Sequence, residues 1–320
     1  MSAGVPSLSV TAFLYQRYFA APDTIDAGMS SHWRAFAPRS RVQVDEAGVP
    51  VGAVGVGFGD MNVRRRGNAA FTTVALLRQL ISGRTPRGLL HATADTRRAS
   101  ARAGLVFNQD ALRQACTLAL LRHRMAGAPI RRVVLIGDGY GLLGALLAQE
   151  WPAAQVVFVD LGRSLLFQAM TCERLFPDVP QALVGRDPDA TVSSARIVFC
   201  PADRLEGWPP GPIDLAVNIA SMQEMTAEAI RGYFDRLRRA PSTWFYCCNR
   251  ERKEMPGGEV SAFMAYPWDP RDEHVLEGLC PWHQTYVAPR RGRGLLLLTL
   301  TARYDGPHLH RLTRLASHAG

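Results

Sequence analysis

Lysine is almost missing from the sequence, although the chain is strongly basic. Of 37 basic residues only Lys253 is lysine, and the formal net charge is +9. This use of Arg, with much Ala, Gly and Pro, is typical of a GC-rich genome. The arginines are scattered, and the clusters at 64–66 and 290–293 lack interleaved aromatic residues for base stacking. We therefore expect a solvated basic surface and no nucleic-acid partner, with an anionic substrate as the alternative.

Long hydrophobic runs are also missing. No apolar run reaches the roughly 18 residues that a membrane-spanning helix needs, and the longest, around 295–300, has the length of a strand. The N-terminal residues show no basic region ahead of their apolar ones, so a signal peptide is not expected. We expect a cytoplasmic protein without a membrane partner, whose 320 residues bury one large core and carry an accessory segment.

Paired cysteine motifs are absent as well. The six cysteines are Cys116, Cys172, Cys200, Cys247, Cys248 and Cys280. None shows C-x-x-C spacing, and most lie among apolar residues of expected helices or strands. The pattern favours buried, reduced thiols, and no zinc or other metal site is expected.

The segment at 131–149 reads RRVVLIGDGYGLLGALLAQ and carries the clearest pattern in the chain. Residues 133–136 are continuously apolar and rich in β-branched side chains, which predicts a central parallel strand covered on both faces. Gly137, Gly139 and Gly141 follow and allow a sharp turn and the close approach of a ligand. A helix from about Leu142 then points its amino end at that ligand.

The spacing of this turn indicates which nucleoside cofactor it binds. A second expected strand, 156–159, ends in Asp160, an acid that can accept hydrogen bonds from both hydroxyls of a ribose. A nicotinamide-binding turn requires G-x-G-x-x-G, and counted from Gly137 the sixth position is Leu142. G-x-G-x-G directly after the strand is instead typical of class I methyltransferases that use S-adenosylmethionine. A nicotinamide or flavin enzyme and a non-binding turn are the alternatives.

One position departs from that pattern. Methyltransferases often carry an acid two residues before the first glycine, where it contacts the amino group of the cofactor, and here this position is Leu135. Asp138, between the glycines, is the candidate substitute.

The carboxyl ends of two further expected strands complete the cofactor site. A third strand at 195–200 leads to Asp203, a candidate for the adenine amino group or else a turn cap. A fourth strand at 213–218 opens onto 220–225, beside the expected methyl group, because ligands of doubly wound sheets bind beyond the carboxyl ends. The expected cofactor contacts are Gly137, Asp138, Gly139, Tyr140, Gly141, Asp160, Leu161, Ala202, Asp203, Asn218, Ile219, Ser221 and Met222.

The order of elements predicts an α/β fold with a Rossmann-like class I methyltransferase sheet of seven strands. A fifth strand at 243–248 precedes two last strands, one ending near 287 and one at 295–304, with no helix between them, as in an antiparallel closing hairpin. Helices are expected at 111–125, capped by Asn108, and at 164–175 and 227–239. Residues 185–194 and 254–272 are expected to be loops.

Residues 1–105 are expected to be an accessory lid or an oligomerisation segment that supports a homodimer, ahead of the methyltransferase domain at 106–320. Helices are expected at 9–20, 30–36 and 70–82. The Val/Gly alternation at 42–59 predicts a small hairpin or a flexible loop, and 86–98 is expected to be irregular.

Six motifs make residues 107–315 resemble the sugar O-methyltransferases of bacterial glycan and natural-product gene clusters. These are IGDGYG, NIASMQEMT (218–226), FYCCNRERKEMPGGE (245–259), YPWD (266–269), LCPWHQ (279–284) and DGPHLHRL (305–312). The resemblance implies a class I methyltransferase fold, S-adenosylmethionine, and a hydroxyl of a sugar-like small molecule as acceptor. A non-sugar scaffold, an N-methyl acceptor and a non-catalytic cofactor-binding protein are the alternatives.

Methyl transfer to a hydroxyl benefits from a base that removes the acceptor proton. The candidates are His283 and Glu224, with a loop-structural role and a helix-capping role as their respective alternatives; His308 and His310 are weaker candidates. Gln223 and Asn249 are suited to orienting hydroxyls.

Further side chains are candidates for binding the acceptor. Arg250, Arg252 and Lys253 can hold an anionic group or form a solvated loop. Trp268 and Trp282 can stack on a sugar or pack in the core. The scattered acids do not predict metal-assisted methylation.

Overall fold

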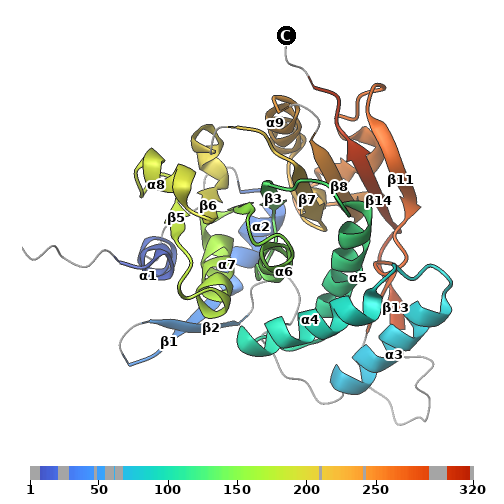
Figure 1. The fold of residues 1–320 in the computed structure, drawn as a ribbon, viewed down its shortest axis with the longest axis horizontal. Helices are drawn as coiled ribbons and strands as arrows, with labels where there is room; N and C mark the ends of the chain where they lie inside the picture. The colour runs from blue at the N-terminus through green and yellow to red at the C-terminus, as the bar shows by residue number, and fades with distance from the viewer. Residues whose placement is uncertain are drawn as a thin grey trace, which may run out of the picture.

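A mixed sheet of eight strands forms the centre of the computed structural model (Figure 1), which describes residues 8–20, 29–46, 49–54, 61, 68–208, 211–240, 243–287 and 301–317. The strand order is β5-β6-β4-β3-β7-β8-β14-β11, and β14 alone runs in the opposite direction to the other seven. The strands are β3 (Arg132–Ile136), β4 (Gln155–Asp160), β5 (Gln181–Leu183), β6 (Ile197–Pro201), β7 (Leu215–Ile219), β8 (Trp244–Arg250), β11 (Glu273–Leu279) and β14 (His308–Arg314).

Helices cover both faces of this sheet, as expected for a doubly wound α/β fold. Along β3, Val133 and Leu135 face one core, and Val134 and Ile136 face the other. The helices are α1 (Val10–Tyr15), α2 (Ser31–Phe36), α3 (Asn68–Ile81), α4 (Leu89–Arg102), α5 (Gln109–Arg124), α6 (Leu142–Glu150), α7 (Gly162–Leu175), α8 (Asp189–Ser194) and α9 (Ala227–Arg238). Side chains of α4–α7 join the first core, and side chains of α8 and α9 join the second. No described helix is long and apolar enough to cross a bilayer.

Most elements predicted from apolar periodicity are confirmed. The Asn108 side chain caps α5 by accepting from the amides of Asp110 and Ala111. Helix α9 buries the face that its spacing predicted, with Phe234 and Leu237 at its centre. All six cysteines are buried and free, as predicted. The Val/Gly segment forms an antiparallel hairpin of β1 (Arg41–Val44) and β2 (Pro50–Val54), while 55–60 lie outside the described residues.

Helix α4 corrects the prediction that 86–98 is irregular. It begins after Gly88, which adopts a left-handed φ of 75°. Its buried face consists largely of small or weakly polar side chains such as Ala92, Thr96 and Ala99, which pack closely against neighbouring helices. The stretch holds few large apolar side chains, so it lacks the residues by which a buried helix is usually recognised in a sequence. The predicted loops at 185–194 and 254–272 are also too simple: the first contains α8, and the second contains short elements described below.

The closing strands of the sheet differ from the predicted ones. The predicted strands near 287 and at 295–304 correspond to β12 (Thr285–Val287) and β13 (Thr301–Arg303), which pair with each other in a separate two-stranded sheet, and 288–300 lie outside the described residues. The antiparallel pair that closes the main sheet is β11 and β14. Because β11 is an edge strand and mostly exposed, it lacks the apolar alternation that marks a strand. The short edge strand β5 makes the count eight rather than the predicted seven.

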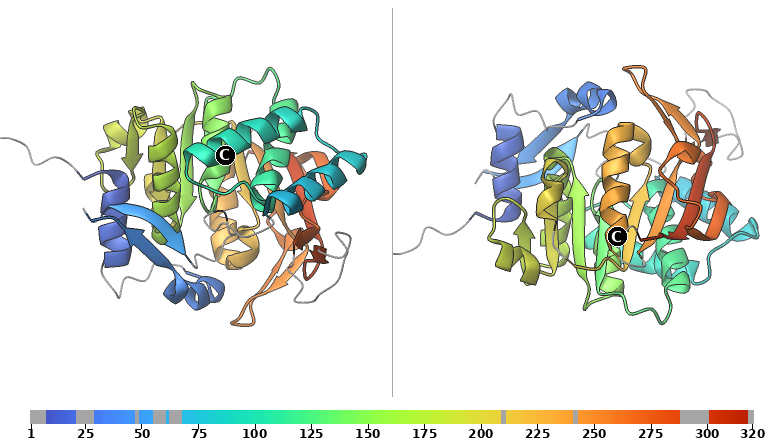
Figure 2. Two further views of the ribbon diagram at one scale, coloured as in Figure 1. Left: turned by 90° about the horizontal axis from the view of Figure 1, so that it is seen from below. Right: turned by 90° about the horizontal axis from the view of Figure 1, so that it is seen from above.

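The N-terminal elements lie against the sheet domain. Helix α1 packs on α7, and both views of Figure 2 show the blue α1 and the β1–β2 hairpin beside the yellow-green α7. Helix α2 contacts the small hairpin of β9 (Arg252–Glu254) and β10 (Val260–Ala262) through Ser31, whose hydroxyl donates to Glu259 Oε2 at 2.6 Å. The first hundred residues therefore reach both sides of the carboxyl edge of the sheet.

Candidate functional site

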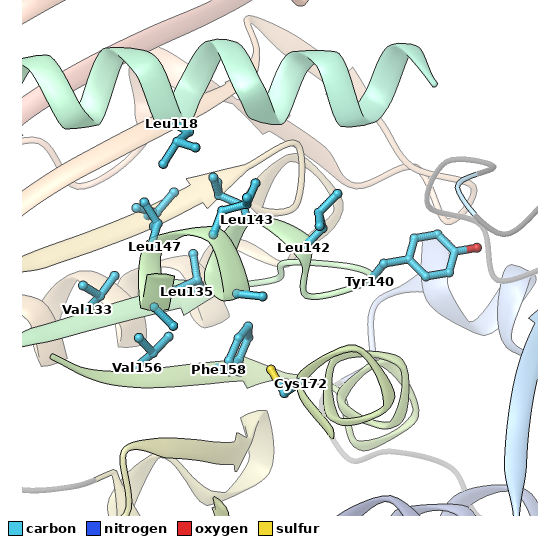
Figure 3. Close-up of a cluster of buried hydrophobic side chains, with 14 of the residues drawn as sticks. Leu118, Val133, Leu135, Tyr140, Leu142, Leu143, Leu147, Val156, Phe158 and Cys172 are labelled. Carbon is cyan, nitrogen blue, oxygen red and sulfur yellow. The ribbon is translucent and has the colours of Figure 1, made fainter. Parts of the chain in front are cut away.

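The glycine turn after β3 has the backbone that its composition predicts. Gly137, Gly139 and Gly141 have φ values of 72°, 59° and 77°, a region that other residues rarely adopt. A Cβ on Gly137 would lie 1.9 Å from Ser221 Oγ, so the loop after β7 also requires glycine here. Figure 3 shows the apolar side chains of β3, β4 and α6 packed behind the turn, while Tyr140 points away from them. The turn is thus rigid and brings backbone to the carboxyl edge of the sheet.

Asp138, within this turn, directs its carboxyl group onto the start of α6. Its Oδ2 accepts the Gly144 amide at 2.7 Å. Burial, with a smaller contribution from the charge of Asp160, raises the pKa of Asp138 to about 8, although the hydrogen bonds from the Gly144 and Leu143 amides act to lower it. The protonated acid is therefore favoured at neutral pH unless a cation binds beside it.

Asp160, at the end of β4, holds its carboxylate by two hydrogen bonds. Oδ1 accepts the Leu161 amide at 2.8 Å, and Oδ2 accepts Gln168 Nε2 at 2.6 Å. Gln168 is buried, and its Oε1 has no hydrogen-bond partner in the described part of the chain. Asp203 lies exposed at the start of η3 (Ala202–Gly207), directly after β6. Three acids thus follow three adjacent strands, an arrangement suited to a cationic ligand with a diol.

A network of buried amides joins the ends of β7 and β8. Asn249 Nδ2 donates to Asn218 Oδ1 at 2.8 Å, and Asn249 Oδ1 accepts the Gln223 amide at 3.1 Å. Gln223 Oε1 in turn accepts the amide of Arg250 at 2.8 Å. Gln223 and Asn249, for which the sequence predicts a role in orienting substrate hydroxyls, support the strand ends through these contacts. Between the strands, Ala220 has a φ of 54°, a strained value that is typical of functional sites.

Glu224 stands in η4 (Met222–Glu224), at the centre of a charged group. Its Oε1 lies 2.6 Å from Lys253 Nζ on β9 and 3.4 Å from His32 Nε2 on α2. The three side chains are largely buried, with 15%, 11% and 11% of their surface exposed. Burial lowers the pKa of His32, Glu224 raises it, and the charges of Lys253 and Arg250 lower it again. His32 is therefore neutral at pH 7 and can accept a proton.

His32 could not be found from the sequence, because its contact with Glu224 joins segments far apart in the chain and no motif surrounds it. The lysine was more visible, since Lys253 is the single lysine among 37 basic residues. A rare ammonium group among many guanidinium groups indicates a position that requires a compact charge.

The N-terminal segment also covers the cofactor side of this edge. A Cβ on Gly162, the first residue of α7, would lie 2.1 Å from Tyr18 Cζ, so the tyrosine ring sits directly on the helix start. On the other side of the glycine turn, a cavity of about 170 Å³ lies between Tyr140, Phe167 and the β1–β2 hairpin. Residues of the first hundred therefore pack on the start of α7 and line a cavity beside Tyr140.

The structure places His283 in a different environment from Glu224. It is 6% exposed and lies beside Cys248 and Cys280, and its ring centroid is 5.6 Å from that of His308. Burial, followed by the charge of Arg113, lowers the pKa of His283 well below its usual value. A histidine so deeply buried is poorly placed to meet an acceptor from solvent.

The other candidates for acceptor binding are two tryptophans and the basic residues near the end of β8. Trp268 joins an aromatic cluster with Phe234 and Phe245, and Trp282 is buried against His310. Both tryptophans therefore pack in cores. Among the basic residues, Lys253 pairs with Glu224, whereas Arg252 is exposed.

No family model matches the chain, and no curated protein sequence matches it. Three solved structures share part of its fold. Phosphoethanolamine N-methyltransferase 2 of Haemonchus contortus, in complex with S-adenosylhomocysteine, is 20% identical with a TM-score of 0.29 over 41% of this chain and 27% of its own. TehB from Haemophilus influenzae is 10% identical with a TM-score of 0.39, over 61% of each chain.

The third structure is an O-methyltransferase family protein from Burkholderia thailandensis, 13% identical with a TM-score of 0.33 over 66% of this chain and 60% of its own. The chain thus spans less than two thirds of the length of each of the three. At these identities and TM-scores, the likenesses do not assign the chemistry of this chain.

Proposed function

We propose that this chain is an S-adenosylmethionine-dependent methyltransferase that acts on a hydroxyl of a sugar or sugar-like natural product. The carboxyl edge of the sheet carries the proposal. There, a left-handed glycine turn follows β3, acids follow β4 and β6, and the sheet closes with β14 inserted antiparallel between β8 and β11. This is the sheet order and turn expected of the class I methyltransferases that the sequence resembles.

The residues at this edge fit the proposed cofactor. Asp160 supplies carboxylate oxygens for a ribose, and Asp203 is exposed where an adenine amino group is expected. Asp138 and Asp160 together favour a cation, because positive charge beside them offsets the cost of ionising the buried Asp138. When bound, S-adenosylmethionine would supply a sulfonium methyl group open to attack by an acceptor oxygen in line with the C–S bond, with the thioether as the leaving group.

The group formed by His32, Glu224 and Lys253 is the proposed acid–base site. Lys253 holds the Glu224 carboxylate, and Glu224 orients the imidazole of His32 through Nε2. A carboxylate oxygen 3.4 Å from Nε2 favours the tautomer that carries its proton on Nε2, so that Nδ1 holds the lone pair that can take the acceptor proton. We therefore transfer the proposed base from His283 to His32, with Glu224 kept in the role of orienting group.

Two measurements test this function. Calorimetry with S-adenosylmethionine should show binding to the wild-type chain and loss of binding in Asp160→Asn, whereas Asp178→Asn, which replaces an exposed acid in a turn, should bind normally. Absence of binding at millimolar cofactor would remove the enzyme proposal. A screen with isotopically labelled methyl cofactor against sugars, other hydroxylated scaffolds and amines would then identify the acceptor by mass; an amine product would replace O- by N-methylation.

The assignment of the base requires a separate comparison. His32→Ala should lower kcat by about 100-fold or more, the range of general base catalysis, and leave the Kd for the cofactor unchanged. His283→Ala should not reproduce this separation of turnover from binding. Unchanged turnover in a folded His32→Ala variant would show that the base is another residue.

A further inference from the structure

Three buried side chains outside the proposed acid–base group bring metal-binding atoms close together. Cys248 Sγ, Cys280 Sγ and one ring nitrogen of His283 all lie within 4.8 Å of each other. The cysteines are fully buried, and His283 is 6% exposed. None of the three serves the proposed methyl-transfer site. Zinc bound by sulfur at about 2.3 Å and by nitrogen at about 2.0 Å holds its ligand atoms roughly 3.5–3.8 Å apart, which a small side-chain adjustment achieves here.

The fold brings these residues together from two segments, strand β8 and the turn after β11. In the register of β8 and β14, Cys248 lies directly opposite His310, so both side chains point to the same face of the sheet. Cys280 follows β11 immediately, and its amide donates to the carbonyl of His308 on β14 at 2.9 Å. The spacing from Cys280 to His283 is C-x-x-H, which a search for C-x-x-C does not detect.

The turn that carries Cys280 and His283 is held from several directions. Gln284 Nε2 donates to the carbonyls of Cys280 and His308 at 2.8 and 2.7 Å. The buried Arg113 on α5 donates from Nε to the carbonyl of Trp282 at 3.2 Å. These bonds fix the backbone between the two donor side chains, so ordering the ligands costs little on metal binding.

A second observation points to a missing partner. Nε2 of His283 is buried and has no hydrogen-bond partner among the residues that the structure describes. A buried imidazole nitrogen without a partner is costly, and a metal ion bound at that nitrogen would satisfy it. The surrounding core is apolar, but two thiolates neutralise a divalent cation and a neutral imidazole adds no charge, so the loaded site would carry no net charge.

We propose that Cys248, Cys280 and His283 form a structural site for a thiophilic divalent cation, Zn²⁺ being the best match to two sulfurs and one imidazole. His310 stands beside it: its Nδ1 lies 3.2 Å from the Tyr246 hydroxyl, and its ring hydrogen-bonds Cys280. His310 is thus placed to supply a fourth nitrogen or to orient the Cys280 sulfur. The site would fasten the turn after β11 to the centre of β8.

Metal content of the full chain tests this proposal without reference to methyl transfer. Protein expressed with added zinc and purified under reducing conditions without chelator should retain about one equivalent of zinc after dialysis, as one closed site requires. Cys280→Ser and His283→Asn should lose it. The matched control is Cys200→Ser, which replaces a buried free cysteine of the opposite core and should retain it.

A spectroscopic measurement keeps the proposal testable if the ligand variants fail to fold. Co²⁺ added to reduced, metal-free wild-type protein should produce a thiolate-to-cobalt charge-transfer band that Zn²⁺ removes, and Cys200→Ser should give the same band. His310→Ala should weaken zinc retention by roughly 10- to 100-fold. A wild-type chain that holds no zinc and gives no cobalt band would overturn the site, as would a disulfide between Cys248 and Cys280 in protein alkylated at lysis.

Discussion

Lys253 carries the single side-chain ammonium group of the sequence and pairs it with Glu224, whereas all the other members of the Lys and Arg set are arginines. An ammonium is a compact point charge, whereas a guanidinium is a planar fork that needs more room. At 2.6 Å from a largely buried carboxylate that also contacts His32, the compact group fits the available geometry. Besides pairing with Glu224, the charge of this lysine lowers the pKa of His32.

The acid limb of the pH–activity profile should therefore move in opposite directions in two variants. A base works above its pKa, and the pKa of His32 is lowered, so wild-type kcat should fall only below about pH 6.5. Lys253→Met removes a charge that lowers this pKa and should move the acid limb to higher pH. Glu224→Gln removes a charge that raises it and should move the limb lower. Parallel shifts in both variants, measured as kcat against pH, would contradict His32 as the base.

Asp138 should make stability depend on pH. Its folded-state pKa of about 8 lies above the value of 3.8 for an unperturbed Asp, so the folded state keeps a proton that the unfolded state releases. The resulting loss of stability grows as pH rises from about 4 to about 8 and is constant above that. Asp138→Asn keeps an oxygen for the Gly144 amide and lacks this titration, so its Tm should exceed that of wild type by a few degrees at pH 8 and by less at pH 5. A Tm difference that does not change with pH would show that Asp138 is not the titrating group.

Helix α2 is the element that completes the proposed acid–base site, although it lies in the segment expected to be a lid or a homodimer interface. Its His32 reaches Glu224, and its Ser31 accepts the Gly257 amide at 3.1 Å and donates to Glu259. These contacts favour the lid over the homodimer interface. They also place a functional residue outside the boundary near 105, which remains a prediction of where the sheet domain begins.

Loosening α2 should affect the acceptor more than the cofactor. Ser31→Ala removes two exposed hydrogen bonds, each worth about 0.5–1.5 kcal/mol, and should lower kcat/KM for the acceptor several-fold while the Kd for S-adenosylmethionine stays constant. Ser9→Ala, which removes the exposed hydroxyl that caps α1, is the control and should leave kcat/KM unchanged. Equal effects of the two variants would remove the special role of α2.

The elements that could be predicted from the sequence are those with a strong apolar contrast. Residues Val133–Ile136 of β3 are buried on both faces and read as a continuous apolar run, and α9 carries a regular apolar face. Helix α4 buries mostly small and polar side chains, and β11 exposes most of its side chains, so neither presents the large buried apolar residues that mark an element in the sequence. Glu224 could be predicted as a site residue because it follows the end of a strand. His32 could not, because it reaches the site only through tertiary packing of α2.

At the scale of the whole molecule, the carboxyl edge joins two cores and the N-terminal segment around one proposed ligand site. A ligand that binds only the folded chain stabilises it, by about 2.7 kcal/mol at 100 times its Kd. S-adenosylmethionine should therefore raise the Tm of wild type by several degrees. The shift should be small in Asp160→Asn and full in Asp178→Asn. A Tm shift of equal size in both variants, measured by differential scanning fluorimetry, would show that Asp160 does not bind the cofactor.

The insertion of β14 between β8 and β11 has a consequence for biosynthesis. On the ribosome β11 is made before β14, yet among the described strands it pairs with the sheet only through β14. Until residues 308–314 emerge, β8 therefore presents an unpaired edge, and β11 has no neighbour in the sheet. Such an intermediate exposes backbone groups that can pair with another nascent chain. We expect the late stage of synthesis to be the period in which this protein depends most on chaperones.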